Sequence, residues 1–177
     1  MLGRIDLDVF TPDAAESARW TASALEDESR RYLESLESTS SQDGVGLYHA
    51  SPRDPVWEYV LTPEAIVGSL LIAPERTVLV GHSHVALAFR IENGALSGDL
   101  APDGTEYELR EDARTLLNPG SVGQPRDGDA RAAWMLLDLG ERSASFRRVE
   151  YPIERTQEEI RERGLPEALA ERLPHGI

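Results

Sequence analysis

The sequence contains neither cysteine nor lysine. Without cysteine there are no disulfides, no cysteine-ligated zinc or iron–sulfur cluster, and no thiol nucleophile. Without lysine there is no P-loop, which needs a Gly-Lys-Ser/Thr step. No apolar run approaches the ~20 residues that a membrane span requires, and residues 1–10 lack the layout of a signal peptide. We therefore expect a soluble cytoplasmic protein with no membrane partner.

Basic residues are scarce relative to acidic ones. The 18 basic residues, all arginine, face 32 acidic residues, which gives a net charge of −14. An acidic surface repels the phosphate backbone of DNA and RNA, so we expect no nucleic-acid partner. The 177 residues, 40 % of them hydrophobic, suffice for a buried core. No repeat, low-complexity tract or linker interrupts them, and the sequence predicts a single domain over 1–177.

The spacing of apolar residues predicts helices at both ends of the chain and strands between them. Helices are expected over 12–25, 27–36, 153–163 and 166–173, with another beginning at residue 63. Strands are expected over 45–48, 77–80, 85–91, 95–100, 107–110, 115–117, 132–139 and 143–151. The polar segment 38–42 and the turn signal Asp43-Gly44 are expected to end the first helical part. The interval between strands 45–48 and 77–80 has the length of a parallel crossover.

Three of the four histidines lie where a predicted strand ends in a loop. His49 comes after strand 45–48, and His82 and His84 come after strand 77–80. Loops at the carboxyl ends of strands are where α/β proteins build their sites. His175 is one of the last three residues of the chain, and we expect it to be exposed and inert.

The tetrapeptide Gly81-His82-Ser83-His84 is the most informative of these segments. In an extended backbone, residues i and i+2 project to the same side, so both imidazoles would point into one space. The glycine allows a tight turn and a close approach of a ligand. Such nitrogens can each hold one of two metal ions ~3.5–4 Å apart. Two exposed histidines in a turn are the alternative, and for His49 the alternative is a partly buried histidine bonded to a loop carbonyl.

Residues 118–127 form a second candidate element, a loop rich in glycine and proline after a strand. Within it, Arg126 has the fork geometry that binds phosphate, or it pairs with Asp127 or Asp129. The run Gly120-Ser121-Val122-Gly123 is not a nucleophile elbow, because its serine stands one place too early.

Taken in order, three blocks resemble the C-terminal part of the calcineurin-like metallophosphoesterases, in particular the small prokaryotic phosphodiesterase-type branch. The blocks are His49-Ala50-Ser51-Pro52, Val78 to His84, and Leu117 to Arg126. The resemblance implies an α/β fold, a partial αββα sandwich with mixed sheets flanked by helices.

The same resemblance implies a two-metal centre acting on a phosphate-ester small molecule. His49 and His82 would ligate one metal ion and His84 the other, the ions being Mn, Fe or Zn. Arg53 and Arg126 are the candidates for binding the phosphate.

The family's N-terminal half has no counterpart in this sequence. That half carries an Asp-x-His step, a Gly-Asp block and a Gly-Asn-His-Asp block, which supply the bridging aspartate and the remaining ligands. We therefore expect an N-terminally incomplete domain. Without a bridging carboxylate two divalent ions repel each other, so it would bind metal weakly and be inactive. An uncovered sheet edge would favour self-association.

Three interpretations remain open for such a chain. It is a truncated form of an ordinary phosphoesterase, or a non-catalytic binding or regulatory module that retains part of the metal site, or one half of a site that a separate chain completes.

Overall fold

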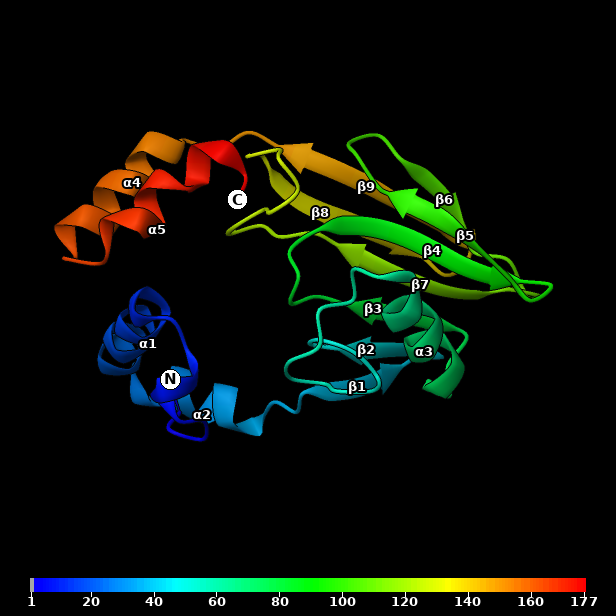
Figure 1. The fold of residues 1–177 in the computed structure, drawn as a ribbon, viewed down its shortest axis with the longest axis horizontal. Coiled ribbons are helices and arrows are strands. Elements are labelled where there is room, and N and C mark those ends of the chain that lie inside the picture. Colours follow the sequence, from blue (N-terminus) through cyan, green and yellow to red (C-terminus); the bar gives the residue numbers. More distant parts are fainter. Residues whose placement is uncertain (1) are drawn as a thin grey trace. The chain divides into compact units, whose positions relative to one another are not determined.

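The computed structural model describes residues 2–177 and divides them into two compact units (Figure 1). The smaller unit combines the residues up to Glu37 with Pro152–His175, and the larger one combines Ser38–Tyr151 with Gly176–Ile177. The single domain expected from the sequence stays a prediction, because a compact unit need not fold alone. No helix within residues 2–177 is long and apolar enough to cross a membrane.

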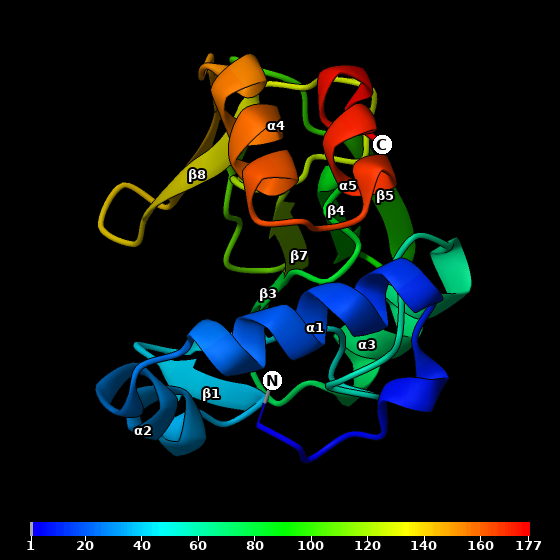
Figure 2. The ribbon, with the colours of Figure 1, turned by 90° about the vertical axis from the view of Figure 1, so that its left-hand side faces the viewer.

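The smaller unit is helical, as predicted. Its elements are η1 (Leu7–Val9), α1 (Pro12–Ala24), α2 (Asp27–Ser35), α4 (Ile153–Glu162), α5 (Glu167–Glu171) and η2 (Leu173–His175). Helix α1 begins at Pro12, in the position where a missing backbone N–H costs nothing. Helices α4 and α5 lie side by side (Figure 2), joined by a 2.9 Å hydrogen bond from Gln157 Nε2 to the carbonyl of Ala170.

The larger unit holds two sheets and one helix. The six-stranded sheet has the order β1-β2-β3-β7-β4-β5, and the three-stranded sheet has the order β6-β9-β8. The strands are β1 (Thr39–Gln42), β2 (Val45–Tyr48), β3 (Thr77–Val80), β4 (Ala86–Glu92), β5 (Ala95–Leu100), β6 (Glu106–Glu108), β7 (Arg114–Pro119), β8 (Ala132–Asp138) and β9 (Ser143–Val149). Strands β2, β3 and β7 are parallel to one another, and β1, β4 and β5 run antiparallel to their neighbours. The predicted mixed α/β fold and the predicted crossover are confirmed.

Strand β1 is the element that the sequence analysis missed. Segment 38–42 was expected to be irregular, but Thr39–Gln42 pairs with β2 through the Asp43-Gly44 turn. Both turn residues have positive φ, 52° and 79°, which is the geometry of a two-residue hairpin turn. All four residues of β1 are exposed, so no alternation of apolar and polar residues marked them as a strand.

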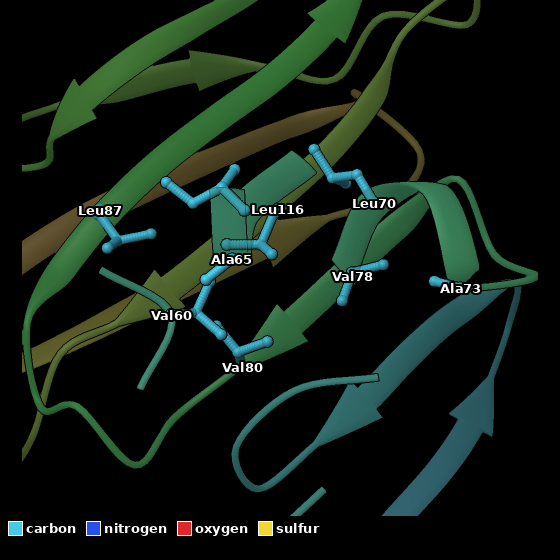
Figure 3. Close-up of a cluster of buried hydrophobic side chains, with 9 residues drawn as sticks. Val60, Ala65, Leu70, Ala73, Val78, Val80, Leu87 and Leu116 are labelled. Atoms are coloured by element: carbon cyan, nitrogen blue, oxygen red, sulfur yellow. The ribbon is translucent and has the colours of Figure 1, made fainter. Parts of the chain in front are cut away.

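Helix α3 (Pro63–Ile72) packs against one face of the six-stranded sheet (Figure 3). Along β7, Leu116 points to this helix while the next residue, Leu117, points to the opposite face. On that opposite face Leu117 and Ala88 meet Phe146 of the three-stranded sheet, and all are buried. The larger unit is thus layered as helix, six-stranded sheet and three-stranded sheet, and parallel strands buried on both faces are expected of this arrangement.

Candidate metal centre

The carboxyl ends of β2, β3 and β7 meet at one edge of the sheet, because the three strands are parallel neighbours. Tyr48 pairs with Val80 at the ends of β2 and β3, so His49 and Gly81 follow side by side. The Gly81 N–H donates to the carbonyl of His49 across 3.0 Å. A Cβ atom on Gly81 would lie 3.3 Å from that oxygen, so the glycine permits the close approach of the two chains.

His49 and His82 face each other at this edge. The Nε2 atom of His49 lies 3.1 Å from the Nδ1 atom of His82, and the ring centroids are 4.8 Å apart. One nitrogen of the pair donates and the other accepts, depending on the tautomers. The predicted convergence of these two histidines is therefore found in the structure.

The backbone at Gly81-His82-Ser83-His84, called here the 81–84 turn, differs from the extended conformation that the sequence analysis assumed. His82 and His84 have φ of 55° and 59°, and the Ser83 N–H donates to the Gly81 carbonyl across 2.6 Å. Residue 82 is thus the centre of a tight three-residue turn with positive φ, a rare and strained form. The extended-strand argument was wrong, and the turn sets the position of each imidazole.

Asn118, the residue after Leu117 in β7, holds the 81–84 turn in place. Its fully buried side chain donates from Nδ2 to the Gly81 carbonyl and to the Ser83 hydroxyl, each across 2.9 Å. Its Oδ1 accepts from the Gly120 N–H at 3.0 Å. These three hydrogen bonds use both N–H groups and the oxygen of the amide. A strained turn persists only where the surrounding structure holds it, and Asn118 supplies such contacts here. The sequence analysis quoted Asn118 only as part of its loop, although a polar residue ending an apolar strand beside β3 was a usable signal.

His84 is oriented by the loop that follows β7. Its Nδ1 lies 2.9 Å from the carbonyl oxygen of Gln124, and its own carbonyl accepts from the Arg126 N–H at 3.0 Å. A carbonyl can only accept, so in neutral His84 the proton is on Nδ1 and the lone pair is on Nε2. Metal-ligating histidines are fixed in this way by a backbone carbonyl.

The surroundings of His82 favour the neutral form of its imidazole. Burial lowers the pKa of its imidazole below the ordinary value of 6.5, and the neighbouring His49, His84 and Arg126 lower it further. A hydrogen-bonding contribution from the backbone of Trp57 acts in the opposite direction but does not reverse the shift. Neutral imidazole is the form that binds metal ions.

Arg126 lies near the histidines, and its contact with phosphate stays a prediction. Its Nη1 donates to the Tyr59 hydroxyl across 3.5 Å, and its Nη2 donates to Gln124 Oε1 across 3.3 Å. The Tyr59 ring in turn packs on His82, with centroids 4.3 Å apart and planes inclined by 34°. Tyr59 was missed because an aromatic residue in a loop belongs to no periodic pattern. Of the alternative partners considered for Arg126, Asp127 pairs with Arg148 instead.

Arg53 is placed differently from Arg126. Its guanidinium forms an ion pair with Glu58, whose carboxylate also accepts from the Ser51 hydroxyl. The arginine also lies over helix α3, where a Cβ on Gly68 would come within 2.9 Å of its Cδ. Its contact with phosphate stays a prediction and requires the pair with Glu58 to open.

The histidines fit one side of a metal centre. Two imidazole nitrogens that bind one ion at ~2.0–2.1 Å from adjacent coordination positions lie roughly 3 Å apart, and the pair His49–His82 has this spacing at 3.1 Å. Within residues 2–177, however, no group of three or more His, Cys, Asp or Glu side chains is arranged to hold a metal ion. The donor set therefore fits two ligands of a first ion and an oriented ligand at His84, but not a complete centre.

Comparison with solved structures finds a close match over nearly the whole chain. A metallophosphoesterase from Sphaerobacter thermophilus shares 37 % sequence identity with it and superposes with a TM-score of 0.86, covering 99 % of this chain and 72 % of that one. The chain belongs to the metallophosphoesterase family. The family that the three histidine- and glycine-containing blocks indicate is thus confirmed, and so is the fold class, whereas the restriction to the C-terminal part and to the phosphodiesterase-type branch stays a prediction.

Two further proteins are similar to this chain, one in sequence and one in fold. An uncharacterised protein of Methanocaldococcus jannaschii is 37 % identical over 183 residues, covering 98 % of this chain and 70 % of that protein. A hypothetical protein of Pyrococcus horikoshii OT3 shares the fold, with a TM-score of 0.76 at 18 % identity, covering 99 % of this chain and 69 % of that one. No protein-family model matches the chain.

Proposed function

We propose that this metallophosphoesterase takes part in the hydrolysis of a small phosphate ester, a phosphomonoester or phosphodiester, with divalent metal ions held in part by His49, His82 and His84. In this reaction water adds to phosphorus, the ester P–O bond breaks, and the leaving alcohol oxygen takes up a proton. The 3.1 Å approach of His49 Nε2 to His82 Nδ1 carries the proposal, because two neutral imidazoles at that spacing are pre-organised for a single ion.

Each residue has a separate task in this proposal. His49 and His82 bind the first ion, and His84 offers Nε2 to the second, since Gln124 holds its Nδ1. Arg126 supplies a positive charge for the phosphate. The divalent ions, of which Mn, Fe and Zn all suit imidazole ligands, supply charge neutralisation at phosphorus when bound.

The histidines alone are not sufficient for efficient turnover. They are neutral donors, and no carboxylate joins them into a three-ligand cluster within residues 2–177. Two divalent ions close together repel strongly unless a carboxylate lies between them. We therefore propose that the complete centre uses carboxylate ligands beyond these residues, and that the 177-residue chain by itself hydrolyses little substrate.

A non-catalytic binding or regulatory module is the second candidate. The incomplete donor set favours it, since two or three imidazoles can bind a metal ion or a phosphate without hydrolysing an ester. Strand β1, the outer strand of the six-stranded sheet with four exposed residues, offers an edge for self-association of such a module.

Calorimetric titration of the full chain with Mn²⁺ tests the metal site. We expect weak binding that disappears in the double variant His49→Ala/His82→Ala and persists in the control His175→Ala, whose side chain is exposed in η2. Equal binding by the parent and the double variant would remove the site. In a parallel assay with a chromogenic phosphodiester we expect little turnover by the chain alone. Robust turnover that is lost in His82→Ala would overturn this expectation and exclude the non-catalytic module.

A further inference from the structure

The segment that follows the Arg53–Glu58 pair presents aromatic side chains next to the histidines. Trp57 and Tyr59 are 45 % and 48 % exposed, whereas Val60 is 1 % exposed and belongs to the core under helix α3. Glu58, between the two aromatic residues, turns to Arg53 and Ser51. Glu58 and Val60 thus hold the segment to the protein, while the side chains of Trp57 and Tyr59 remain about half exposed to solvent.

The start of this segment is ordered by hydrogen bonds. The Asp54 carboxylate accepts from the backbone N–H groups of Val56 and Trp57, each across 3.1 Å. Ser51, which is fully buried, accepts from the N–H of Asp54 at 2.9 Å. An aromatic surface on such a fixed loop is available to a ligand without a large cost of ordering it.

The Tyr59 ring bridges the two parts of the site. It packs on His82 with ring centroids 4.3 Å apart, and its hydroxyl accepts from Arg126 at 3.5 Å. Nearly half of the residue still faces solvent. Tyr and Trp combine a large apolar ring with a polar tip, and this combination suits them to recognition surfaces.

We propose that Tyr59, with Trp57 near it in the loop, is the stacking platform for a planar aromatic group on the substrate, so that the substrate class is a nucleoside or aryl phosphate. The phosphate lies against Arg126 and the histidines, and the ring lies on the exposed side of Tyr59. This inference rests on the proposed function, because it assigns the leaving group of the same phosphate ester.

A purely structural role for Tyr59 predicts a different pattern of affinities. If the ring only shields His82, then removing it changes the binding of every phosphate ester alike. A stacking platform strengthens the binding of aromatic ligands alone, by roughly 5- to 150-fold for one base on one aromatic side chain. The ratio of affinities for aromatic and non-aromatic phosphates therefore separates the two roles.

The test is a titration of the full chain, in the presence of Mn²⁺, followed by the indole N–H resonances of its tryptophans. The three ligands are adenosine 5′-monophosphate, phenyl phosphate and ribose 5-phosphate, and a Trp57→Phe variant assigns the resonance of Trp57. We expect the parent to bind at least one aromatic ligand 5-fold or more tightly than ribose 5-phosphate, with a shift of the Trp57 signal. Preference for both aromatic ligands indicates an aryl site, and preference for the nucleotide alone indicates a nucleobase site.

Variants of Tyr59 complete the experiment. Tyr59→Leu should bring the ratio of the affinities for the aromatic ligands and for ribose 5-phosphate close to one, whereas Tyr59→Phe should retain the preference. Tyr32→Leu, at an exposed position of helix α2, is the matched control. Equal binding of the three ligands by the parent would overturn the platform and leave the phosphate site intact. If the parent binds none of the three ligands, or binds them no better than Arg126→Gln does, then the proposed function is overturned together with the inference.

Discussion

The Nε2 atom of His49 and the Nδ1 atom of His82 lie 3.1 Å apart at the ends of two parallel strands. In the free protein a single proton between two neutral rings satisfies both nitrogens. For both facing nitrogens to bind one metal ion, the proton between them must move to the other nitrogen of its ring, so this hydrogen bond and metal binding by both nitrogens exclude each other. In the metal-bound form that we propose, the same two nitrogens would be ligands.

Replacing Asn118 by alanine should loosen the 81–84 turn. The substitution leaves the Gly81 carbonyl and the Ser83 hydroxyl without their buried donor, at a cost of about 1–3 kcal/mol for each group left unsatisfied. We expect a lower free energy of unfolding and weaker Mn²⁺ binding, measured by urea denaturation and calorimetry. Gln42→Ala, on the exposed strand β1, should change neither. Unchanged metal binding in a folded Asn118→Ala protein would show that the amide does not position the histidines.

The sequence was sufficient for the elements with strong apolar patterns and insufficient for the details of the site. The apolar run 77–80 predicted β3, and the length of the interval after strand 45–48 predicted its parallel pairing with β2 and the approach of His49 to His82; in the structure Val78 and Val80 pack into the core under α3. Nothing in the letters indicated that His82 and His84 adopt positive φ, because non-glycine residues do so only when tertiary contacts such as those of Asn118 hold them there.

Long-range partners were equally hidden from the sequence. Arg126 was expected beside phosphate or an aspartate and lies beside Tyr59, 67 positions away, while Arg53 was expected at phosphate and pairs with Glu58. Charged side chains are long enough to reach several partners, so only the fold decides between them. Strand β1 was missed for a related reason. Its four residues are exposed and show no apolar pattern, and only the backbone pairing with β2 makes the segment a strand.

Gly98→Ala should be among the most destabilising substitutions in the six-stranded sheet. Gly98 has φ of 144°, and a Cβ atom there would collide with the backbone of Ala88 and Phe89 on the paired strand β4. Backbone strain and a clash with immobile atoms together cost more than about 2 kcal/mol. Gly123→Ala is the control, because a Cβ atom there meets nothing within 4 Å. Thermal unfolding of the two variants should separate them by several degrees, and equal melting temperatures would contradict the observed register of β4 and β5.

Arg148→Met should destabilise the larger unit by about 3–5 kcal/mol, the range for removing one partner of a buried ion pair. The side chains of Arg148 and Asp127 are only 4 % and 7 % exposed, and Asp127 also accepts from the Ala86 N–H at 3.1 Å. Its other carboxylate oxygen has no hydrogen-bond partner within residues 2–177. The double variant Arg148→Met/Asp127→Asn, which removes both charges, should recover part of the loss in a denaturation experiment. Additive losses would show that the pair contributes no coupling energy.

Stability should depend on acid through Glu58. Hydrogen bonding from Arg53 is the main cause that lowers the pKa of this carboxyl below its ordinary value of 4.5, and the Ser51 hydroxyl adds to it. A carboxyl whose pKa is lower in the folded protein stabilises the fold above the unfolded value, and this contribution is lost as the pH falls through the folded pKa. Glu58→Gln should therefore lower the melting temperature modestly at pH 7, and the difference from the parent should shrink below about pH 4.5.

Glu64→Gln, on the exposed first turn of α3, controls for the change in net charge. A difference between parent and Glu58→Gln that stays constant from pH 7 to pH 3 would mean that the ionised carboxylate does not anchor the aromatic loop, and the rigidity assumed for Tyr59 would then need another source.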